Sequence, residues 1–168
     1  MLQSSRLYWL SLSLLGSFEP IIVRGQGMNK IPIVNTTTGT YQGFQPYPGI
    51  YAYLGMPYAE PPVGDLRFES LRPFKANDPE AGIDATGSFA GCYQVLYNTI
   101  LSDKIAGTRE SEDCLFINVW APSNASANAS LPVLIWIYGG GFAEGASTPY
   151  DGVGFVTEHP DVIFVSIK

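Results

Sequence analysis

The segment Leu131–Tyr150, LPVLIWIYGGGFAEGASTPY, joins a continuous apolar run directly to three glycines and a phenylalanine. An apolar run bounded by turn residues is typical of a strand that is buried on both faces, as in a parallel sheet. The glycines Gly139, Gly140 and Gly141 let successive backbone N–H groups turn toward one point without interference from a Cβ atom. The sequence therefore predicts a buried strand that ends in an anion-binding loop.

Two kinds of nucleotide-binding loop are also rich in glycine, and neither fits this segment. A dinucleotide fingerprint starting at Gly139 needs a glycine where Glu144 stands, and a carboxylate there would face the pyrophosphate. A phosphate loop over residues 140–145 has Ala146 where the phosphate-binding lysine is required. A plain flexible turn stays possible for glycines taken alone. The remaining chemical interpretation is a loop of neutral backbone donors for a small oxyanion, as in the HGGG-type loop of lipases and esterases.

Six hydrophobic runs have the length and composition of β-strands. These runs are Ile31–Thr36, Tyr41–Phe44, Ile50–Leu54, Leu115–Trp120, Val133–Tyr138 and Val162–Ile167. The first two predict a hairpin around Gly39. The last two are apolar throughout, so we expect them to be buried parallel strands. A short helix over Asp151–Glu158 would connect them, and this strand, helix, strand order indicates an α/β fold.

Composition narrows the class of protein. The chain is 46% hydrophobic and 14% charged, which indicates a globular chain, and its 168 residues suggest one domain. A net charge of −6 without a basic run opposes nucleic acid as a partner. One histidine, His159, and two cysteines cannot supply a zinc site, so we predict no metal and no other cofactor.

Pro57, Pro61, Pro62 and Gly64 oppose regular structure and predict an ordered loop.

The first residues resemble a secretory signal. Arg6 precedes an apolar stretch from Leu7 to Phe18, which is shorter than the roughly 20 residues that a membrane-spanning helix needs. We therefore expect a cleaved signal peptide over residues 1–25, with the cut between Ser17 and Gly27, and no transmembrane anchor.

Glycosylation sequons also predict export. They begin at Asn35, Asn124 and Asn128, and the last two lie in a polar stretch between apolar runs, where a sugar could stay in solvent. Together with the expected signal peptide, these sequons predict a secreted, extracellular glycoprotein.

Three long motifs resemble the type-B carboxylesterase family, which includes the cholinesterases and many fungal lipases. The motifs are YLGMPYAEPPVGDLRF at 53–68, SEDCLFINVWAP at 111–122 and WIYGGGF at 136–142, in the family's order. The resemblance runs from about Pro32 to Ile167 and is weakest between Phe74 and Gly91. It implies an α/β-hydrolase fold, of which residues 26–168 are the N-terminal part, truncated after the first strands of the central sheet. Such a truncation would leave a strand of the sheet without its later neighbours.

The resemblance also implies roles for individual residues. Gly140 and Gly141 match the loop glycines whose N–H groups stabilise the tetrahedral oxyanion, and Gly139 lets the chain approach the substrate. Each donor of this kind lowers the barrier by roughly 2.7–4 kcal/mol. Arg67 and Glu112 match a structural ion pair, and a plain surface pair contributes only about 0–1 kcal/mol.

The two cysteines, Cys92 and Cys114, are either bridged or two buried free thiols. In an oxidising compartment a bridge over this span would stabilise the fold by roughly 3 kcal/mol on the chain-entropy model. The resemblance favours the bridge, because Cys114 lies in the EDCL motif whose cysteine closes such a loop in the family.

The catalytic triad is missing from these residues. An ester hydrolase of this class needs Gly-x-Ser-x-Gly, then an acid, then a histidine. The nearest segment, Gly145–Pro149, ends in proline and follows no strand directly, so we do not expect Ser147 to be a nucleophile. His159 precedes the last strand, so we expect a surface residue. The family's domain is much longer, and Lys168 stands where the family continues with Asn-Tyr-Arg.

We therefore hypothesise the N-terminal portion of a secreted serine carboxylic-ester hydrolase, inactive alone, whose full-length form acts on a small-molecule or lipid carboxylic ester. A catalytically silent cholinesterase-like binding or adhesion module is the alternative, and a genuine short secreted protein is a third possibility. Phe142 and Tyr150 are candidates for the lining of a substrate gorge and equally for ordinary core or rim aromatics. The sequence assigns neither the ester nor the oligomeric state.

Overall fold

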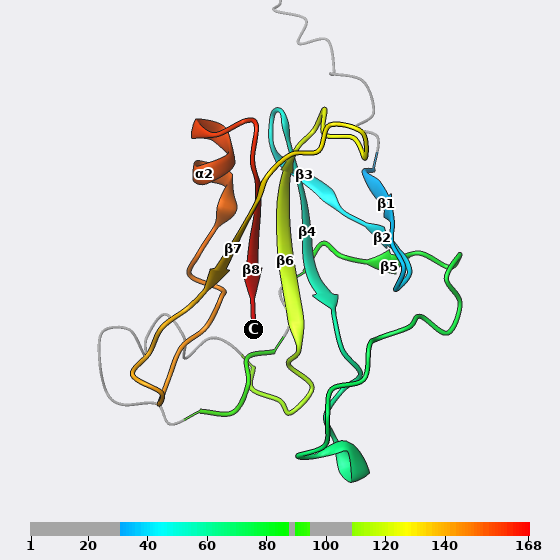
Figure 1. Ribbon diagram of the computed structural model, residues 1–168, viewed down its shortest axis with the longest axis vertical. Coiled ribbons are helices and arrows are strands. Elements are labelled where there is room, and N and C mark those ends of the chain that lie inside the picture. The colour runs from blue at the N-terminus through cyan, green and yellow to red at the C-terminus, as the bar shows by residue number, and fades with distance from the viewer. Residues whose placement is uncertain (1–30, 88–89, 95–108) are drawn as a thin grey trace, which may run out of the picture.

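The computed structural model describes residues 31–87, 90–94 and 109–168, so the expected signal peptide over residues 1–25 lies outside the described residues. Within this part the chain forms two sheets, with strand orders β1-β2-β5 and β3-β4-β6-β8-β7, and helix α2 beside the larger one (Figure 1). The strands are β1 (Ile33–Asn35), β2 (Thr40–Gln42), β3 (Phe44–Tyr47), β4 (Ile50–Pro57), β5 (Ile83–Asp84), β6 (Phe116–Pro122), β7 (Val133–Ile137) and β8 (Ile163–Ile167), and α2 is Gly152–Glu158.

The predicted hairpin around Gly39 is confirmed, but both strands are shorter than expected, and the first covers Ile33–Asn35 where Ile31–Thr36 was predicted. β1 and β2 pair antiparallel, with Val34 opposite Tyr41. The prediction ran the second strand through Phe44, whereas Phe44 begins β3 in the larger sheet. The chain changes sheet at Gly43, where a Cβ atom would lie 2.3 Å from the Ala52 carbonyl oxygen. A glycine allows this close crossing of two backbones.

Strand β4 is longer than the predicted run and ends at Pro57, which pairs with Phe116 of β6. The prediction that Pro57 lies outside regular structure is therefore wrong, although this proline is the last residue of its strand. The loop that follows is irregular, as predicted, except for one 3₁₀ turn over Gly64–Leu66. The two-residue strand β5, parallel to β2, was not predicted.

The strand, loop, helix, strand order around the glycines is confirmed. β7 and β8 pair in parallel over their full length, from Val133 opposite Ile163 to Ile137 opposite Ile167. Helix α2 connects them and begins where the Asp151 carboxylate accepts a 2.9 Å hydrogen bond from the Val153 N–H. This N-cap satisfies one of the free donors at the start of the helix. The α/β prediction is therefore correct.

Burial of β7 was predicted and is wrong for the described residues. Its five side chains are exposed, from 38% for Leu134 to 75% for Ile137. β7 lies at the edge of the five-stranded sheet, and α2 packs on β4, β6 and β8. Within residues 31–87, 90–94 and 109–168, the strand of the larger sheet next to β8 that has no second neighbour is therefore β7.

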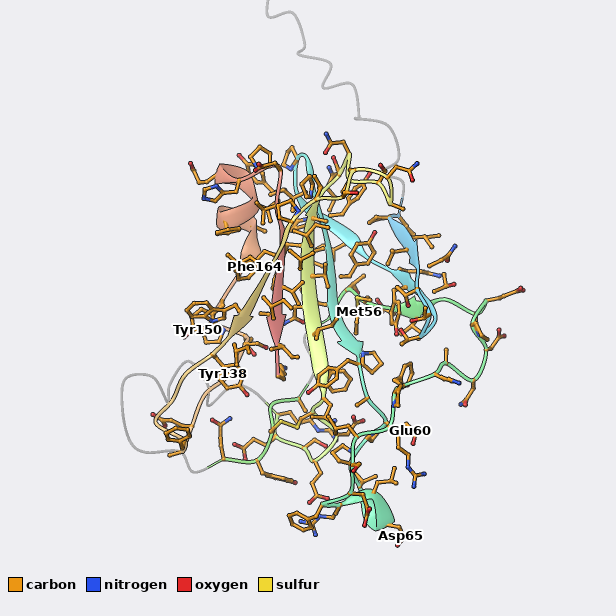
Figure 2. All side chains as sticks on the ribbon, viewed as in Figure 1. Met56, Glu60, Asp65, Tyr138, Tyr150 and Phe164 are labelled. Carbon is orange, nitrogen blue, oxygen red and sulfur yellow. A yellow bond between two sulfur atoms is a disulfide. The ribbon has the colours of Figure 1, made fainter. Side chains whose placement is uncertain are left out.

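The core has one cluster on each face of the larger sheet. Phe164 belongs to the cluster under α2, with its ring centroid 5.7 Å from that of Trp120. Met56 belongs to the cluster that faces the smaller sheet, together with Tyr41 and Tyr53. The two clusters lie on opposite sides in Figure 2, where Phe164 and Met56 are labelled. The larger sheet therefore lies between two packed clusters, and the loops leave from its ends.

Candidate active site

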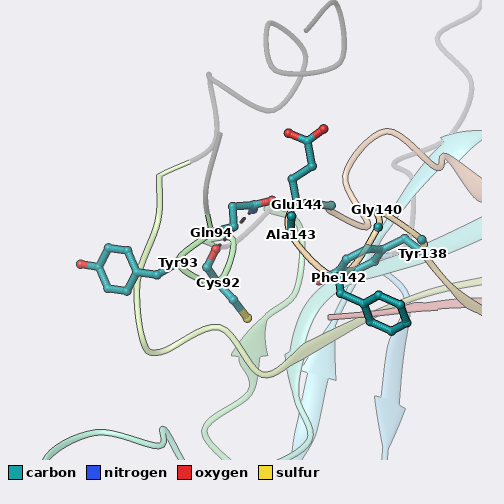
Figure 3. Close-up of a pocket in the computed structure, with 11 residues that line it drawn as sticks. Cys92, Tyr93, Gln94, Tyr138, Gly140, Phe142, Ala143 and Glu144 are labelled. Carbon is teal, nitrogen blue, oxygen red and sulfur yellow. Dashed lines mark hydrogen bonds between the residues drawn. The ribbon is translucent and has the colours of Figure 1, made fainter. Parts of the chain in front are cut away.

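The glycine loop directly follows β7 and lines the pocket drawn in Figure 3. The pocket has a volume of about 380 Å³. Its walls come from two segments that are far apart in the sequence, the region of the first cysteine and the loop itself. The lining residues are Cys92, Tyr93, Gln94, Tyr138 and residues 139–145.

The tip of the loop is a tight turn closed on one carbonyl. The Gly140 oxygen accepts hydrogen bonds from the N–H groups of Ala143 and Glu144, both at 3.1 Å. Gly141 has a φ of 62°, a left-handed conformation that favours glycine. A Cβ atom on Gly140 would lie 1.3 Å from the Glu144 carbonyl oxygen, so no larger residue fits that position without moving the turn. The shape of the turn therefore depends on these glycines.

Phe142 continues the turn in an unfavourable backbone conformation. Its φ is 62°, and its side chain lies at the loop tip, fully exposed. A left-handed backbone costs a non-glycine residue roughly 1–2 kcal/mol. Such outliers gather at ligand sites, where the surroundings hold them in place.

The N–H groups that were predicted to be oxyanion donors belong to Gly140 and Gly141 of this loop. Within the described part of the chain, the N–H groups of Gly140 and Gly141 donate to no protein atom. Gly140 is half-buried and Gly141 is exposed, and both line the pocket. Two neighbouring N–H groups of this kind are able to bind a small oxyanion.

The glycine loop has two stems, residues 138–139 before the turn and residues 144–145 after it. The second stem is hydrogen-bonded to a residue beside the disulfide. The Gln94 side-chain oxygen accepts a 2.5 Å hydrogen bond from the Gly145 N–H. Cys92, two residues earlier, is bridged to Cys114 with a Cα–Cα distance of 5.1 Å, so the alternative of two free thiols is excluded. Sequence reasoning missed Gln94; its position two residues after a bridged cysteine was the one available signal.

The loop residues after Gly145 are anchored in a buried polar cluster. The Asn118 side-chain NH₂ donates to the Ser166 hydroxyl at 3.2 Å and to the Ser147 hydroxyl at 3.5 Å, while its oxygen accepts from the Gly55 N–H at 2.9 Å. All three polar side chains are buried, and Ser147 is 1% exposed. The Ser147 hydroxyl is therefore held in this cluster and does not line the pocket beside the glycine loop.

Two tyrosines near the pocket stay uncharged. Burial raises the pKa of the Tyr138 phenol. Burial, together with the neighbouring Tyr138, also raises the pKa of Tyr58, whose hydroxyl donates to the Lys168 carbonyl oxygen at 2.6 Å. Both phenols are therefore protonated at neutral pH and add no negative charge that would oppose an oxyanion.

The remaining predicted residues lie outside this pocket. The Arg67 guanidinium is 2.8 Å from the Glu112 carboxylate, so the predicted ion pair is present, with side chains 52% and 36% exposed. His159 is exposed and its ring contacts that of Phe155 in a tilted arrangement, with ring centroids 4.7 Å apart. Tyr150 stacks on Trp136, at 5.1 Å between centroids, and does not line the pocket.

The three predicted glycosylation sequons begin at surface positions. Asn35, Asn124 and Asn128 are all exposed. Among the described residues no cluster of three or more His, Cys, Asp or Glu side chains could hold a metal ion. In the same ranges no helix is long and apolar enough to cross a membrane.

Comparison with known proteins matches the chain to longer relatives. Residues 30–168 match the model of the carboxylesterase family. The acylcarnitine hydrolase of Mus musculus is 35% identical over 174 residues, which cover 95% of this chain and 30% of that protein. The acetylcholinesterase of Bungarus fasciatus is 40% identical over 146 residues, which cover 80% of this chain and 23% of that protein.

A solved structure shows the same fold. The crystal structure of Aspergillus niger EstA superposes with a TM-score of 0.70 at 34% identity, over 83% of this chain and 26% of that chain. The present chain thus spans less than a third of the length of each of these proteins. The family match covers the strands, the disulfide and the glycine loop described above, and the chain belongs to the carboxylesterase family.

Proposed function

We propose that this chain is the N-terminal portion of a secreted serine carboxylic-ester hydrolase and that it supplies the oxyanion hole. Family membership supports the reaction class. The observation that carries the assignment is the pair of N–H groups at Gly140 and Gly141, which have no protein acceptor within the described residues and line a pocket. The turn that presents them requires glycine at position 140.

The loop would act on the developing charge of the substrate. In acyl transfer to serine, attack on the ester carbonyl converts its oxygen into an oxyanion, which collapses as the alcohol leaves. Backbone donors aimed at that oxygen stabilise it more than the neutral carbonyl, and each such donor contributes roughly 2.7–4 kcal/mol. The neutral phenols of Tyr58 and Tyr138 are compatible with this charge.

The nucleophile has to come from further residues of the polypeptide. None of the 168 residues lies at the centre of a Gly-x-Ser-x-Gly motif. We therefore expect the serine, the acid and the histidine of the triad to follow the printed sequence, and the printed residues alone to be inactive. The substrate would be a small-molecule or lipid carboxylic ester.

Export is part of the same proposal. The disulfide between Cys92 and Cys114 fits an oxidising compartment. Exposure of Asn35, Asn124 and Asn128 leaves each sequon open to glycosylation. Secretion of the polypeptide into the culture medium, with a mass that falls on enzymatic removal of N-glycans, would support it, and retention inside the cell would contradict it.

The first test is to sequence the transcript across the codon for Lys168. We expect the message to continue into a Gly-x-Ser-x-Gly segment and a later histidine. A message that continues without that serine would support the alternative of a catalytically silent binding or adhesion module. A message that stops at Lys168 would exclude hydrolysis by this mechanism.

The second test is catalytic, on the polypeptide expressed from the full transcript. Gly140→Ala has to displace the Glu144 carbonyl and the donors beside it, so kcat for a p-nitrophenyl ester should fall by about 10²–10³ with KM little changed. Gly154→Ala on α2, where a Cβ atom meets nothing within 4 Å in the described part, is the matched control and should keep full activity. Equal activity in both variants would contradict the assignment of the oxyanion hole.

A further inference from the structure

We propose that Gln94 is a positioning residue of this site: its side-chain oxygen holds the glycine loop at Gly145 and thereby fixes where the Gly140 and Gly141 N–H groups lie. The catalytic consequence rests on the proposed function, whereas the effect on the loop itself does not. In Figure 3 Gln94 lies between Cys92 and the glycine loop.

The orientation of the Gln94 amide is fixed by both of its ends. Its oxygen accepts from the Gly145 N–H at 2.5 Å, and its NH₂ group donates to the Cys92 carbonyl oxygen at 3.3 Å. A flipped amide would place a donor against a donor and an acceptor against an acceptor. The amide is therefore held in the orientation that binds the loop.

Gly145 is the point at which the two stems of the loop meet. A Cβ atom on Gly145 would lie 2.5 Å from the Tyr138 ring and 2.6 Å from the Gly139 carbonyl oxygen. A hydrogen bond at Gly145 therefore acts on the incoming and the outgoing stem together. The tip between them is closed by its own hydrogen bonds to the Gly140 oxygen, so it would move with the stems as one unit.

The glycine loop thus has an anchor on each side. Ser147 is held in the sheet by Asn118, inside the buried polar cluster. Gln94 holds the pocket side, and its own backbone is tied to the sheet through the disulfide from Cys92 to Cys114, two residues before β6. Loss of the Gln94 oxygen would release the pocket side and leave the sheet side in place.

The variants separate the acceptor from the bulk of the side chain. Gln94→Met keeps the length of the side chain but offers only a weakly accepting sulfur, and Gln94→Glu keeps an acceptor oxygen. Gln45→Met is the control, because Gln45 is half-buried on β3 and its side chain makes no hydrogen bond within the described residues. The polypeptide expressed from the full transcript is used throughout.

Two readouts are compared. Hydrogen–deuterium exchange over residues 138–147 measures the loop directly, and exchange should be about 5- to 10-fold faster in Gln94→Met but unchanged in Gln45→Met. Gln94→Glu keeps the acceptor for Gly145 and loses the donor to the Cys92 carbonyl, so its exchange should rise less than that of Gln94→Met. Turnover of a p-nitrophenyl ester reports whether the Gly140 and Gly141 N–H groups are correctly placed. The kcat of Gln94→Met should fall about 10-fold, with KM and the unfolding midpoint unchanged. Turnover is not compared for Gln94→Glu, because a carboxylate beside the pocket would itself oppose an oxyanion.

The outcomes distinguish this proposal from the proposed function. Unchanged exchange in Gln94→Met, or faster exchange with a normal kcat, overturns the positioning role. If the wild-type polypeptide hydrolyses no ester, the proposed function fails, and exchange at the hydrogen-bonded amides of Ala143, Glu144 and Gly145 alone decides whether Gln94 holds the loop. If Gln94→Met does not fold, Gln94→Asn replaces it, since its shorter amide is out of reach of Gly145; unchanged exchange in that variant also overturns the proposal.

Discussion

Strands β7 and β8 are neighbours with similar apolar sequences and opposite surroundings. β8, IFVSI, has a strand on each side and α2 above it, and its Phe164 and Ser166 are 7% and 0% exposed. Among the described residues β7, VLIWI, has one neighbouring strand, and its least covered side chain, Ile137, is 75% exposed. An apolar run predicts that a strand belongs inside a sheet, but the elements around it decide whether its side chains are covered.

The largest expected difference in the free energy of unfolding is between truncating a buried side chain on β8 and truncating an exposed one on β7. Phe164→Ala removes a ring from the cluster under α2 and should lower the free energy of unfolding by about 3–5 kcal/mol. Ile135→Ala, at a position 60% exposed, should change it by no more than about 0.5 kcal/mol. Urea unfolding of the polypeptide that consists of the 168 printed residues measures both values. Equal losses would break the comparison, since they would mean that β7 is covered in solution.

The second-largest loss of stability is expected when the disulfide between the sheet and the loop region is removed. The double substitution Cys92→Ser and Cys114→Ser removes the cross-link beside β6 and should lower the free energy of unfolding by about 3 kcal/mol. Hydrogen exchange should rise in the glycine loop more than in β8, because Gln94 lies on the disulfide side of the pocket. A reductant should reproduce the change in the wild type and have no effect on the double variant. A uniform rise along the chain would argue against a link to the loop.

A smaller effect tests how closely α2 covers β8. Gly152→Ala places a Cβ atom 2.6 Å from the Trp120 ring and 2.7 Å from the Phe164 ring, so we expect a loss of about 1–3 kcal/mol. Gly154→Ala, on the same helix with open space within the described part, should instead stabilise the protein by about 0.4–1 kcal/mol. Opposite signs in thermal unfolding would sharpen the contrast between the covered and uncovered strands. The same sign at both positions would place α2 farther from the sheet.

The smallest loss of stability is expected at the partly exposed ion pair between Arg67 and Glu112. Arg67→Ala removes the contact with Glu112, and because both side chains are at least a third exposed, the loss should be about 0–1 kcal/mol and should shrink in high salt. A double-mutant cycle with Glu112→Ala isolates the pair from the packing of Arg67 on Phe68, whose ring lies 5.3 Å away. A coupling above about 2 kcal/mol would show that this region is as well shielded as β8.

Much of the fold could be predicted because local sequence determines it. The hairpin around Gly39 and the capped helix that starts after Asp151 depend on residues close together in the chain. The parallel pairing of β7 and β8 followed from two apolar runs joined by a helix. The disulfide followed from family resemblance together with the presence of only two cysteines.

The features that could not be predicted depend on contacts between distant segments. The change of sheet at Gly43 is set by the Ala52 carbonyl, and the exposure of β7 is set by what lies beside it. In the site, the glycine loop was visible as a pattern, but its anchors were not. Gln94 and Asn118 are ordinary amides in the sequence, and only the fold brings them to residues 145 and 147.

Strand β7 places the turn that carries two of the sequons far from the pocket. The sequons at Asn124 and Asn128 precede this strand, and the glycine loop follows it. Five residues of strand span about 17 Å, so these exposed turns and the pocket stand at opposite poles of the larger sheet. The turn at residues 123–130 is therefore a natural place for a fluorescent label or a surface tether, which would report on the molecule or immobilise it while the pocket stays open.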